Sequence, residues 1–162
     1  FNALNPKLTI ITNSSGCLNL DWELGSFMLI EKFLDFSFIH SKNVTKYKVK
    51  KMDYYSNILN MANEINVTLY EGTYTFTTGP SYETDSEVKE IIKNGGNAVG
   101  MSTFPEFLKS EALNLNSLFI SCLTNYGAGL TNGKINHKDV LKNANKAKND
   151  FCRLIIKIIE NI

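Results

Sequence analysis

The sequence predicts an α/β fold with a mixed, mainly parallel sheet that is flanked by helices. Strand-like runs of apolar and β-branched residues alternate with segments of helical periodicity along the chain. The run "SLFISCLTN" (117–125) is mostly apolar and carries no charge, as expected of a strand that is covered on both faces. Several strand-like runs end in glycine or polar residues, and in α/β sheets ligands bind beyond the carboxyl ends of the strands.

The first half of the chain predicts two strands, a loop and a helix. "LTIITN" (8–13) is a short β-branched strand, and Asn13-Ser14-Ser15-Gly16 after it predicts a turn. "GSFMLIEKF" (25–33) predicts the second strand. The segment 40–51 is polar and holds five lysines, which favours a solvated loop over a functional basic patch. Apolar residues at helical spacing predict a helix over 52–65.

The second half of the chain predicts a regular alternation of strands and helices. Thr84 and Glu87 form a capping box at the start of one helix, and Pro105 opens the next. The last helix has a single apolar stripe. The predicted strands are 66–79, 97–102 and 117–125, and the predicted helices are 84–94, 105–114 and 137–160.

The composition is that of an ordinary globular protein, with 43% hydrophobic residues, 20% charged residues and a net charge of +1. This charge predicts no nucleic-acid partner. We expect one domain over residues 1–162. Three cysteines without paired spacing indicate a reducing, cytoplasmic compartment, and the sequence predicts no membrane span or signal peptide. Because the chain begins with Phe1 and a strand follows almost at once, we expect it to be a segment of a longer protein.

The polar strand ends are the candidate site. Ser14, Ser15 and Gly16 offer N–H groups and hydroxyls that suit an anion, although taken alone they favour a plain turn. Ser102 follows a strand in the same way. The capping box does not account for Glu83, so its carboxylate is a candidate acceptor.

Other candidates have a structural reading beside the functional one. Asn125 can donate and accept, so it can read the edge of a heterocycle. His137 can donate to a hydroxyl or simply begin the last helix. Tyr74, Tyr82 and Met101 can form an apolar wall or belong to the core. We find no metal-ligand spacing and no dinucleotide-binding or phosphate-loop motif, so no metal and no nucleotide cofactor are predicted.

Four blocks of the sequence carry a family resemblance. They are "IITNSSGCLN", "TYTFTTGPSYETDSEV", "NAVGMSTFPE" and "SCLTNYGAGLTNGKINHKDV". In combination and order they resemble the trimeric, high-mass purine nucleoside phosphorylases and their methylthioadenosine phosphorylase relatives. The resemblance covers nearly the whole chain, from about Leu8 to the final helix.

The resemblance implies a role for each matching residue. It places Glu83 and Asn125 on the purine base and His137 near the ribose 5′-hydroxyl, as the catalytic set. Ser14 and Ser102 match phosphate-binding positions. The remaining substrate-binding positions are Ser15, Gly16, Tyr74, Tyr82, Val99, Gly100 and Met101.

The implied reaction is phosphorolysis of inosine, guanosine and their deoxy forms to a free purine and (deoxy)ribose 1-phosphate, as in purine salvage. An asparagine that donates near N7 and O6 stabilises the charge on the leaving purine. A carboxylate on the N1–H side positions the ring. The resemblance further implies inorganic phosphate as co-substrate, no other cofactor and a homotrimer.

The chain departs from this family at several points. It lacks the N-terminal half, in which a Gly-Ser-Gly strand end and an R-x-H-x-Y-E-G stretch bind phosphate. The segment between Phe33 and Met52 is shorter than the family's loop. Ser14-Ser15 replaces Ala-Ala, and Cys17 replaces a glycine, where its side chain could crowd the pocket.

Three functions therefore remain open at the level of sequence. The first is a phosphorylase of 6-oxopurine nucleosides. The second is a 5′-methylthioadenosine phosphorylase, in which an aspartate at position 125 and an apolar residue at position 137 would be expected. The third is a truncated, catalytically inactive relative that keeps the fold.

Overall fold

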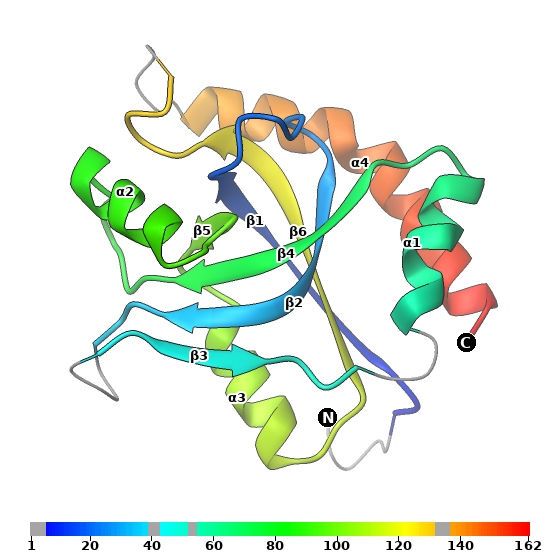
Figure 1. Cartoon of the computed structure of the whole chain (residues 1–162). Helices are drawn as coiled ribbons and strands as arrows, with labels where there is room; N and C mark the ends of the chain where they lie inside the picture. Colours follow the sequence, from blue (N-terminus) through cyan, green and yellow to red (C-terminus); the bar gives the residue numbers. More distant parts are fainter. Residues whose placement is uncertain (1–5, 39–42, 52–54, 132–136) are drawn as a thin grey trace.

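Six strands and four helices form the part of the chain that the computed structural model describes, namely residues 6–38, 43–51, 55–131 and 137–162 without the side chains of His137 and Asp139. From α1 onward helices and strands alternate along the chain, as the sequence predicts (Figure 1). In order they are β1 (Thr9–Cys17), β2 (Phe27–Asp35), β3 (Thr45–Lys48), α1 (Tyr55–Glu64), β4 (Leu69–Phe76), α2 (Asp85–Lys93), β5 (Ala98–Gly100), α3 (Phe104–Ala112), β6 (Ser117–Tyr126) and α4 (His137–Glu160).

The strands form one mixed sheet in the order β3-β2-β4-β5-β1-β6. The pairings β1–β6, β2–β4 and β4–β5 are parallel, whereas β2–β3, β1–β5 and β2–β6 are antiparallel. Because β2 also pairs with β6, the sheet closes on itself into a ring of five strands with β3 outside it. The predicted α/β class with a mixed sheet is confirmed.

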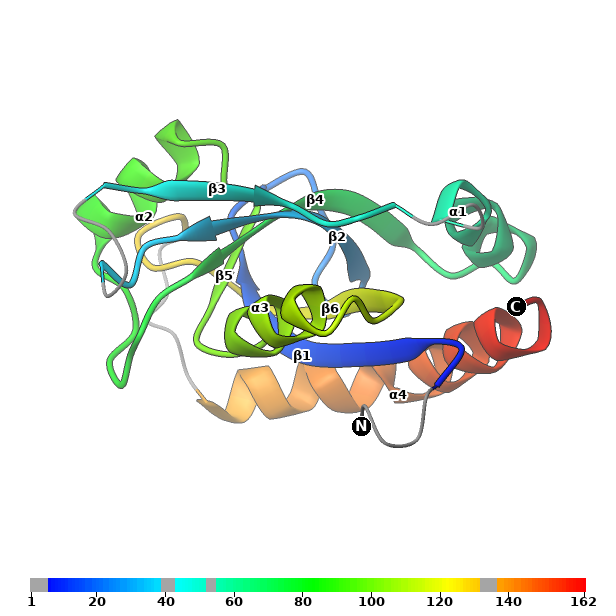
Figure 2. The same ribbon diagram turned by 90° about the horizontal axis from the view of Figure 1, so that it is seen from below.

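Two layers of core pack against this sheet. Phe33 lies at the centre of the first, with ring centroids 4.6 Å from Phe107 of α3 and 5.5 Å from Phe119 of β6. The second lies under α1 and α4, which pack against each other (Figure 2). Phe119 faces the first core while Leu118 and Ile120 face the second. The prediction that this strand is covered on both faces is therefore confirmed.

Two sequence-based expectations were wrong. The segment Asn13–Gly16 is not a turn, because β1 continues to Cys17 alongside β6, with a register shift between Ser15 and Gly16. The segment 40–51 is not only loop, because Thr45–Lys48 pairs with β2 as an edge strand. Tyr47 packs there with its ring centroid 5.3 Å from that of Phe104. The alternation of lysines with apolar residues was a strand pattern that the number of lysines obscured.

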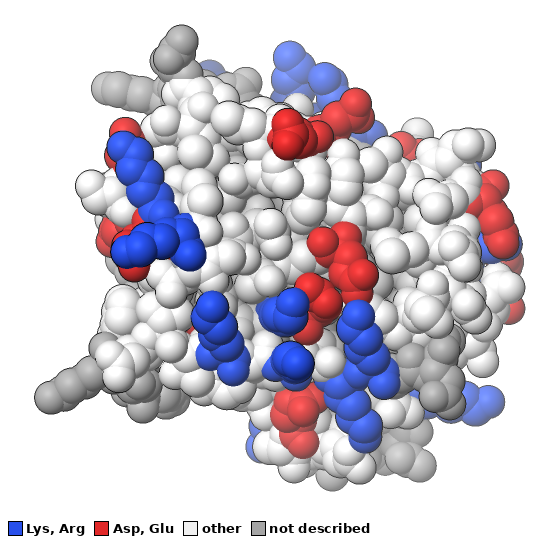
Figure 3. Space-filling view, viewed as in Figure 1, with Lys and Arg blue, Asp and Glu red and all other residues white. Residues whose placement is uncertain are grey.

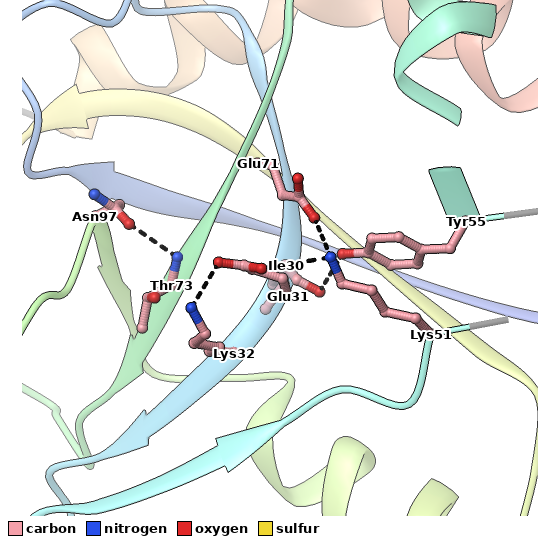
Figure 4. A network of polar contacts seen from close by, with 8 residues as sticks. All are labelled: Ile30, Glu31, Lys32, Lys51, Tyr55, Glu71, Thr73 and Asn97. Carbon is pink, nitrogen blue, oxygen red and sulfur yellow. Dashed lines mark hydrogen bonds and ion pairs between the residues drawn. The ribbon is translucent and has the colours of Figure 1, made fainter. Parts of the chain in front are cut away.

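Among the described lysines of this region, Lys46 and Lys51 are tied to other parts of the fold. Lys51 forms ion pairs with Glu71 at 2.8 Å and with Glu31 at 3.6 Å, and its ammonium group lies 4.9 Å from the centre of the Tyr55 ring (Figure 4). Lys46 donates to the Asn94 carbonyl at 3.0 Å. Figure 3 shows that basic and acidic groups are interleaved on this face, which agrees with the reading of segment 40–51 as structural and not as a functional basic patch.

Within the described ranges, no helix has the length and apolar character needed to cross a membrane.

Candidate functional site

A cavity of about 250 Å³ lies where β1, β5 and β6 end, close to the ~300 Å³ at which ligand pockets begin. It is also bordered by the loop that follows β4. Ligands bind beyond the carboxyl ends of the strands in α/β folds, both in open sheets and in closed barrels. The residues that line it are Ser14, Ser15, Gly16, Tyr82, Glu83, Val99, Gly100, Met101, Ser102, Thr124, Asn125, Gly127 and Val140.

Ten of the twelve residues that the sequence proposed for the site line this one cavity, although 111 positions separate Ser14 from Asn125. The parallel pairing of β1 with β6 brings these two regions together, because Gly16 lies opposite Asn125 in the register. The two exceptions are Tyr74 and His137. The sequence did not single out Thr124, Gly127 or Val140.

Tyr74 does not reach the cavity surface. Its side chain is fully buried, with its ring 5.7 Å from that of Phe33, and its hydroxyl lies behind Gly100. Burial raises the pKa of Tyr74 to about 12, which Ser102 nearby partly opposes. No hydrogen bond of normal geometry to this hydroxyl is found among the described residues. Tyr74 is a core residue beneath the cavity wall because β4 directs it inward.

His137 begins α4, but its side chain lies outside the described residues. Its predicted place near the ribose stays a prediction.

Cys17 does not line the cavity. Its side chain is buried in the first core, where its Sγ donates to the Asn19 carbonyl at 3.2 Å, and burial raises the pKa of the thiol. The expected crowding of the pocket by this residue was wrong, since β1 turns the side chain toward the core.

The side chain of Glu83 takes no part in the helix cap beside it. The predicted capping box of α2 is present, with Thr84 N–H donating to Glu87 Oε2 at 2.7 Å and Glu87 N–H donating to Thr84 Oγ1 at 3.4 Å. Glu83 instead accepts from the Thr77 hydroxyl at 2.7 Å through Oε1. A carboxylate can accept several hydrogen bonds, so this contact orients Glu83 and leaves acceptor capacity toward the cavity.

Gly79 lets the loop that carries Glu83 lie against Met101. A Cβ at Gly79 would be 2.4 Å from Met101 Sδ, and the residue has a φ of +65°. Only glycine adopts this conformation without strain and allows such a close approach. Because position 79 has no side chain, the loop that carries Glu83 can pack directly against Met101, which follows β5.

Asn125 is held in one orientation by its neighbours. Its Nδ2 donates to the Tyr126 carbonyl at 3.1 Å, and its Oδ1 is 3.1 Å from the Thr124 hydroxyl. The Thr124 hydroxyl also lies 3.3 Å from the Ser15 carbonyl, so its single proton is shared between Asn125 Oδ1 and that carbonyl. An amide nitrogen has two N–H groups, so one remains for a ligand. Thr124 is therefore a positioning residue; the sequence places it at the polar end of this strand but assigns it no role.

The cavity wall combines an acceptor, an amide donor and small hydroxyls with the apolar Met101 and the aromatic Tyr82, which is 49% exposed. Glu83 is the one charged residue among the described residues that line it. The described residues contain no cluster of His, Cys, Asp and Glu that could hold a metal ion. Such a lining can bind a flat polar ring at its edge and its face.

Comparison with known proteins gives consistent matches. The model of the phosphorylase superfamily matches residues 1–160. Purine nucleoside phosphorylase 1 of Geobacillus stearothermophilus is 33% identical over 99% of this chain and 62% of its own length. A probable S-methyl-5′-thioinosine phosphorylase of Methanopyrus kandleri is 30% identical over 98% of this chain and 66% of its own length.

The fold matches a solved structure in the same way. The crystal structure of Schistosoma mansoni purine nucleoside phosphorylase in complex with inosine superposes with a TM-score of 0.87 at 24% identity, over 99% of this chain and 63% of that chain. The chain spans somewhat less than two thirds of the length of these relatives. With its family model matched along almost its whole length, the chain belongs to the phosphorylase superfamily, and the resemblance to purine nucleoside phosphorylases drawn from its motifs is confirmed.

Proposed function

We propose that this chain forms the base-binding part of a purine nucleoside phosphorylase that acts on 6-oxopurine nucleosides. The observation that carries the proposal is the pairing of Glu83 and Asn125 in one cavity, an acceptor and a donor held by Thr77 and Thr124. A 6-oxopurine presents an N1–H donor and an O6 acceptor on adjacent atoms. Glu83 would accept from N1–H, and Asn125 would donate to O6 or N7.

The reaction needs no covalent intermediate on the protein. The C1′–N9 bond of the nucleoside breaks, its electron pair stays on the purine, and a phosphate oxygen forms the new bond to C1′. Donation from Asn125 toward O6 and N7 stabilises the charge that develops on the base. The purine is then protonated and leaves. No cofactor besides phosphate is part of this proposal.

Phosphate would lie near Ser14 and Ser102, which line the same cavity. The described residues that line it include no Lys, Arg or His. Neutral donors alone hold an anion weakly compared with charge-assisted contacts. We therefore expect turnover to depend on cationic groups beyond those described here.

The proposal predicts selective binding of the free base. Hypoxanthine should bind more tightly than adenine by at least about fivefold, because each mismatched buried polar group costs roughly 1–3 kcal/mol. Asn125→Asp should narrow this ratio, since an aspartate can accept from the 6-amino group, and Glu83→Ala should weaken hypoxanthine binding. Isothermal titration calorimetry on the chain measures both affinities.

Asn116→Asp is the matched control, because Asn116 is an asparagine outside the cavity that donates to the Lys7 carbonyl. It should leave both affinities unchanged. Equal affinities for hypoxanthine and adenine in the unmodified chain would refute the assignment of Glu83 and Asn125 as base readers.

Two other functions are supported by particular observations. The relative named as a thioinosine phosphorylase supports activity on 5′-methylthio nucleosides, and kcat/KM for inosine against 5′-methylthioinosine and 5′-methylthioadenosine separates these substrates. The lack of a cationic side chain among the described lining residues supports an inactive binding protein. Such a protein would bind hypoxanthine but release none from inosine when phosphate is added.

The proposal includes a homotrimer in the cytoplasm. The family resemblance supports the trimer, and Cys17, Cys122 and Cys152 are free thiols, which fits a reducing compartment. Light scattering at micromolar concentration tests the trimer, and a monomer there would count against it.

A further inference from the structure

The turn that carries Ser102 has an unusual backbone. Phe104 N–H donates to the Ser102 carbonyl at 2.9 Å, and Thr103 between them has φ +75° and ψ −32°. This is a γ-turn with positive φ at its central residue, the rare and strained form. Thr103 is β-branched, and such residues disfavour positive φ strongly. The surrounding structure must therefore hold this turn in place.

The Thr103 side chain does not cap α3, although Thr103 lies at the capping position of this helix. Thr103 is the residue before the first turn of α3, where a threonine hydroxyl normally caps a backbone N–H. No such hydrogen bond is present. Instead, Asn13 Nδ2 donates to Thr103 Oγ1 at 2.5 Å. Thr103, which is 2% exposed, is thus attached through its side chain to β1 and not to its own helix.

Asn13 is itself fixed by a buried chain of hydroxyls. Ser121 Oγ donates to Asn13 Oδ1 at 2.5 Å, and the two residues are direct neighbours in the β1–β6 register. Ser15 Oγ lies 2.6 Å from Ser121 Oγ. Since the Ser121 proton goes to Asn13, Ser15 donates to Ser121. Each group in this network donates to the next, from Ser15 to Ser121, then to Asn13 and finally to Thr103. These contacts hold the asparagine amide in one orientation.

We propose that Asn13 and Ser121 are positioning residues that hold Thr103 in its strained conformation and so direct Ser102 into the cavity. The network joins two walls of the site, because Ser15 and Ser102 both line the cavity while Asn13 and Ser121 lie beneath it. Without the contact from Asn13, the turn relaxes toward negative φ and Ser102 leaves its place. That Ser102 meets phosphate rests on the proposed function, whereas the restraint of the turn does not.

Hydrogen exchange tests the restraint without any substrate. In Asn13→Ala, the amide of Phe104 should exchange at least about tenfold faster than in the unmodified chain. Ser121→Ala, a smaller change, should produce the same effect in weaker form. Ser117→Ala is the matched control, because Ser117 is a buried serine on the same strand whose hydroxyl has no hydrogen-bond partner in the described structure. Its Phe104 exchange should stay as in the unmodified chain.

Steady-state kinetics on the full-length enzyme tests the consequence for the site. Asn13→Ala should raise KM for phosphate about tenfold while KM for inosine changes by less than about twofold, a split that general destabilisation does not produce. Unchanged exchange at Phe104 in Asn13→Ala would overturn the proposal. Faster exchange with an unchanged KM for phosphate in an active enzyme would also overturn it. If the unmodified enzyme binds no purine and has no activity, the proposed function fails, and the exchange data alone decide the restraint of the turn.

Discussion

At the scale of single residues, only Gly100 lies between the cavity and the core residue Tyr74 at this point of the wall. Gly100 separates the cavity from the buried Tyr74, and a Cβ at this position would be 2.3 Å from the Tyr74 hydroxyl. Tyr74 cannot easily move, because its ring lies edge-on to Phe33 in the first core. The resemblance assigned Tyr74 to the substrate. The structure instead indicates that the residue determines where the wall, and with it Met101 and Ser102, can lie.

This arrangement predicts a rescue between positions 100 and 74. Gly100→Ala should destabilise the fold by about 1–3 kcal/mol, because the added methyl group overpacks a rigid site. Tyr74→Phe alone should cost little, since it removes a buried hydroxyl that has no hydrogen bond of normal geometry in the described structure. Combined with Gly100→Ala, it should restore most of the stability. Urea denaturation of the four proteins measures the coupling, and additive effects would contradict the direct contact.

At the scale of elements, the capping box of α2 fixes where the loop that carries Glu83 ends. Thr84 caps the helix directly after Glu83, so the helix start determines the position of the loop that carries the carboxylate. The hydrogen bond from the Thr84 backbone N–H holds the pKa of Glu87 below its usual range, and a second one from the Thr84 side chain acts in the same direction. The cap is therefore complete at neutral pH and weakens as the pH falls through the lowered pKa of Glu87.

Removing this cap should have a modest and specific effect. Thr84→Ala should lower the free energy of unfolding by about 1 kcal/mol, whereas Thr84→Ser keeps the oxygen and should cost only a fraction of that. Chemical denaturation near neutral pH measures both variants. If Glu83 reads the base as proposed, the affinity for hypoxanthine should fall too, since Glu83 directly precedes the capping residue. A Thr84→Ala protein as stable as the unmodified chain would show that the cap contributes nothing.

Sequence reasoning predicted most elements because their signals are local. The capping box, the apolar stripe of α4 and the continuous apolar run of β6 can each be read within a few residues. The run Asn13–Gly16 was misread as a turn because its small polar residues owe their strand pairing to β5 and β6, which lie about 80 and 105 residues further on. The site was found through strand ends and family motifs, whereas the Asn13 network depends on contacts across 90 and 108 positions that no local pattern encodes.

At the scale of the whole molecule, charge adds to the contacts that join β2, β4 and the segment after β3. Lys51, which follows the edge strand β3, forms ion pairs with Glu31 of β2 and Glu71 of β4. Glu31 also pairs with Lys32 at 3.0 Å. Figure 4 shows these groups converging on one another, and none of them lines the cavity. The cluster therefore affects the stability of the sheet without touching the candidate site.

This cluster predicts how stability depends on pH. The hydrogen bond from Lys32, helped by the charges of Lys32 and Lys51, holds the pKa of Glu31 below its ordinary 4.5. The hydrogen bond with Glu71 raises the pKa of Lys51 above 10.5, with the charges of Glu71 and Glu31 acting in the same direction. A lowered carboxyl pKa stabilises the fold above the unfolded pKa, and this contribution is lost as the pH falls through the folded value. A raised lysine pKa stabilises it below the unfolded pKa, and this contribution is lost as the pH rises through the folded value.

Glu31→Gln should accordingly destabilise the protein at neutral pH and lose its effect in acid. Because these side chains are 24–52% exposed, solvent screening limits the difference to about 0–1 kcal/mol. Urea denaturation of the unmodified chain and of Glu31→Gln, Lys51→Met and the double variant separates the pair from the single effects. The stability curves of the unmodified chain and of the Glu31→Gln variant should converge in acid, once the pH has fallen through the lowered pKa of Glu31, and added salt should shrink the gap at neutral pH. A gap of the same size in acid and at neutral pH would mean that Glu31 acts through packing, and that charge does not hold β2 to the segment after β3.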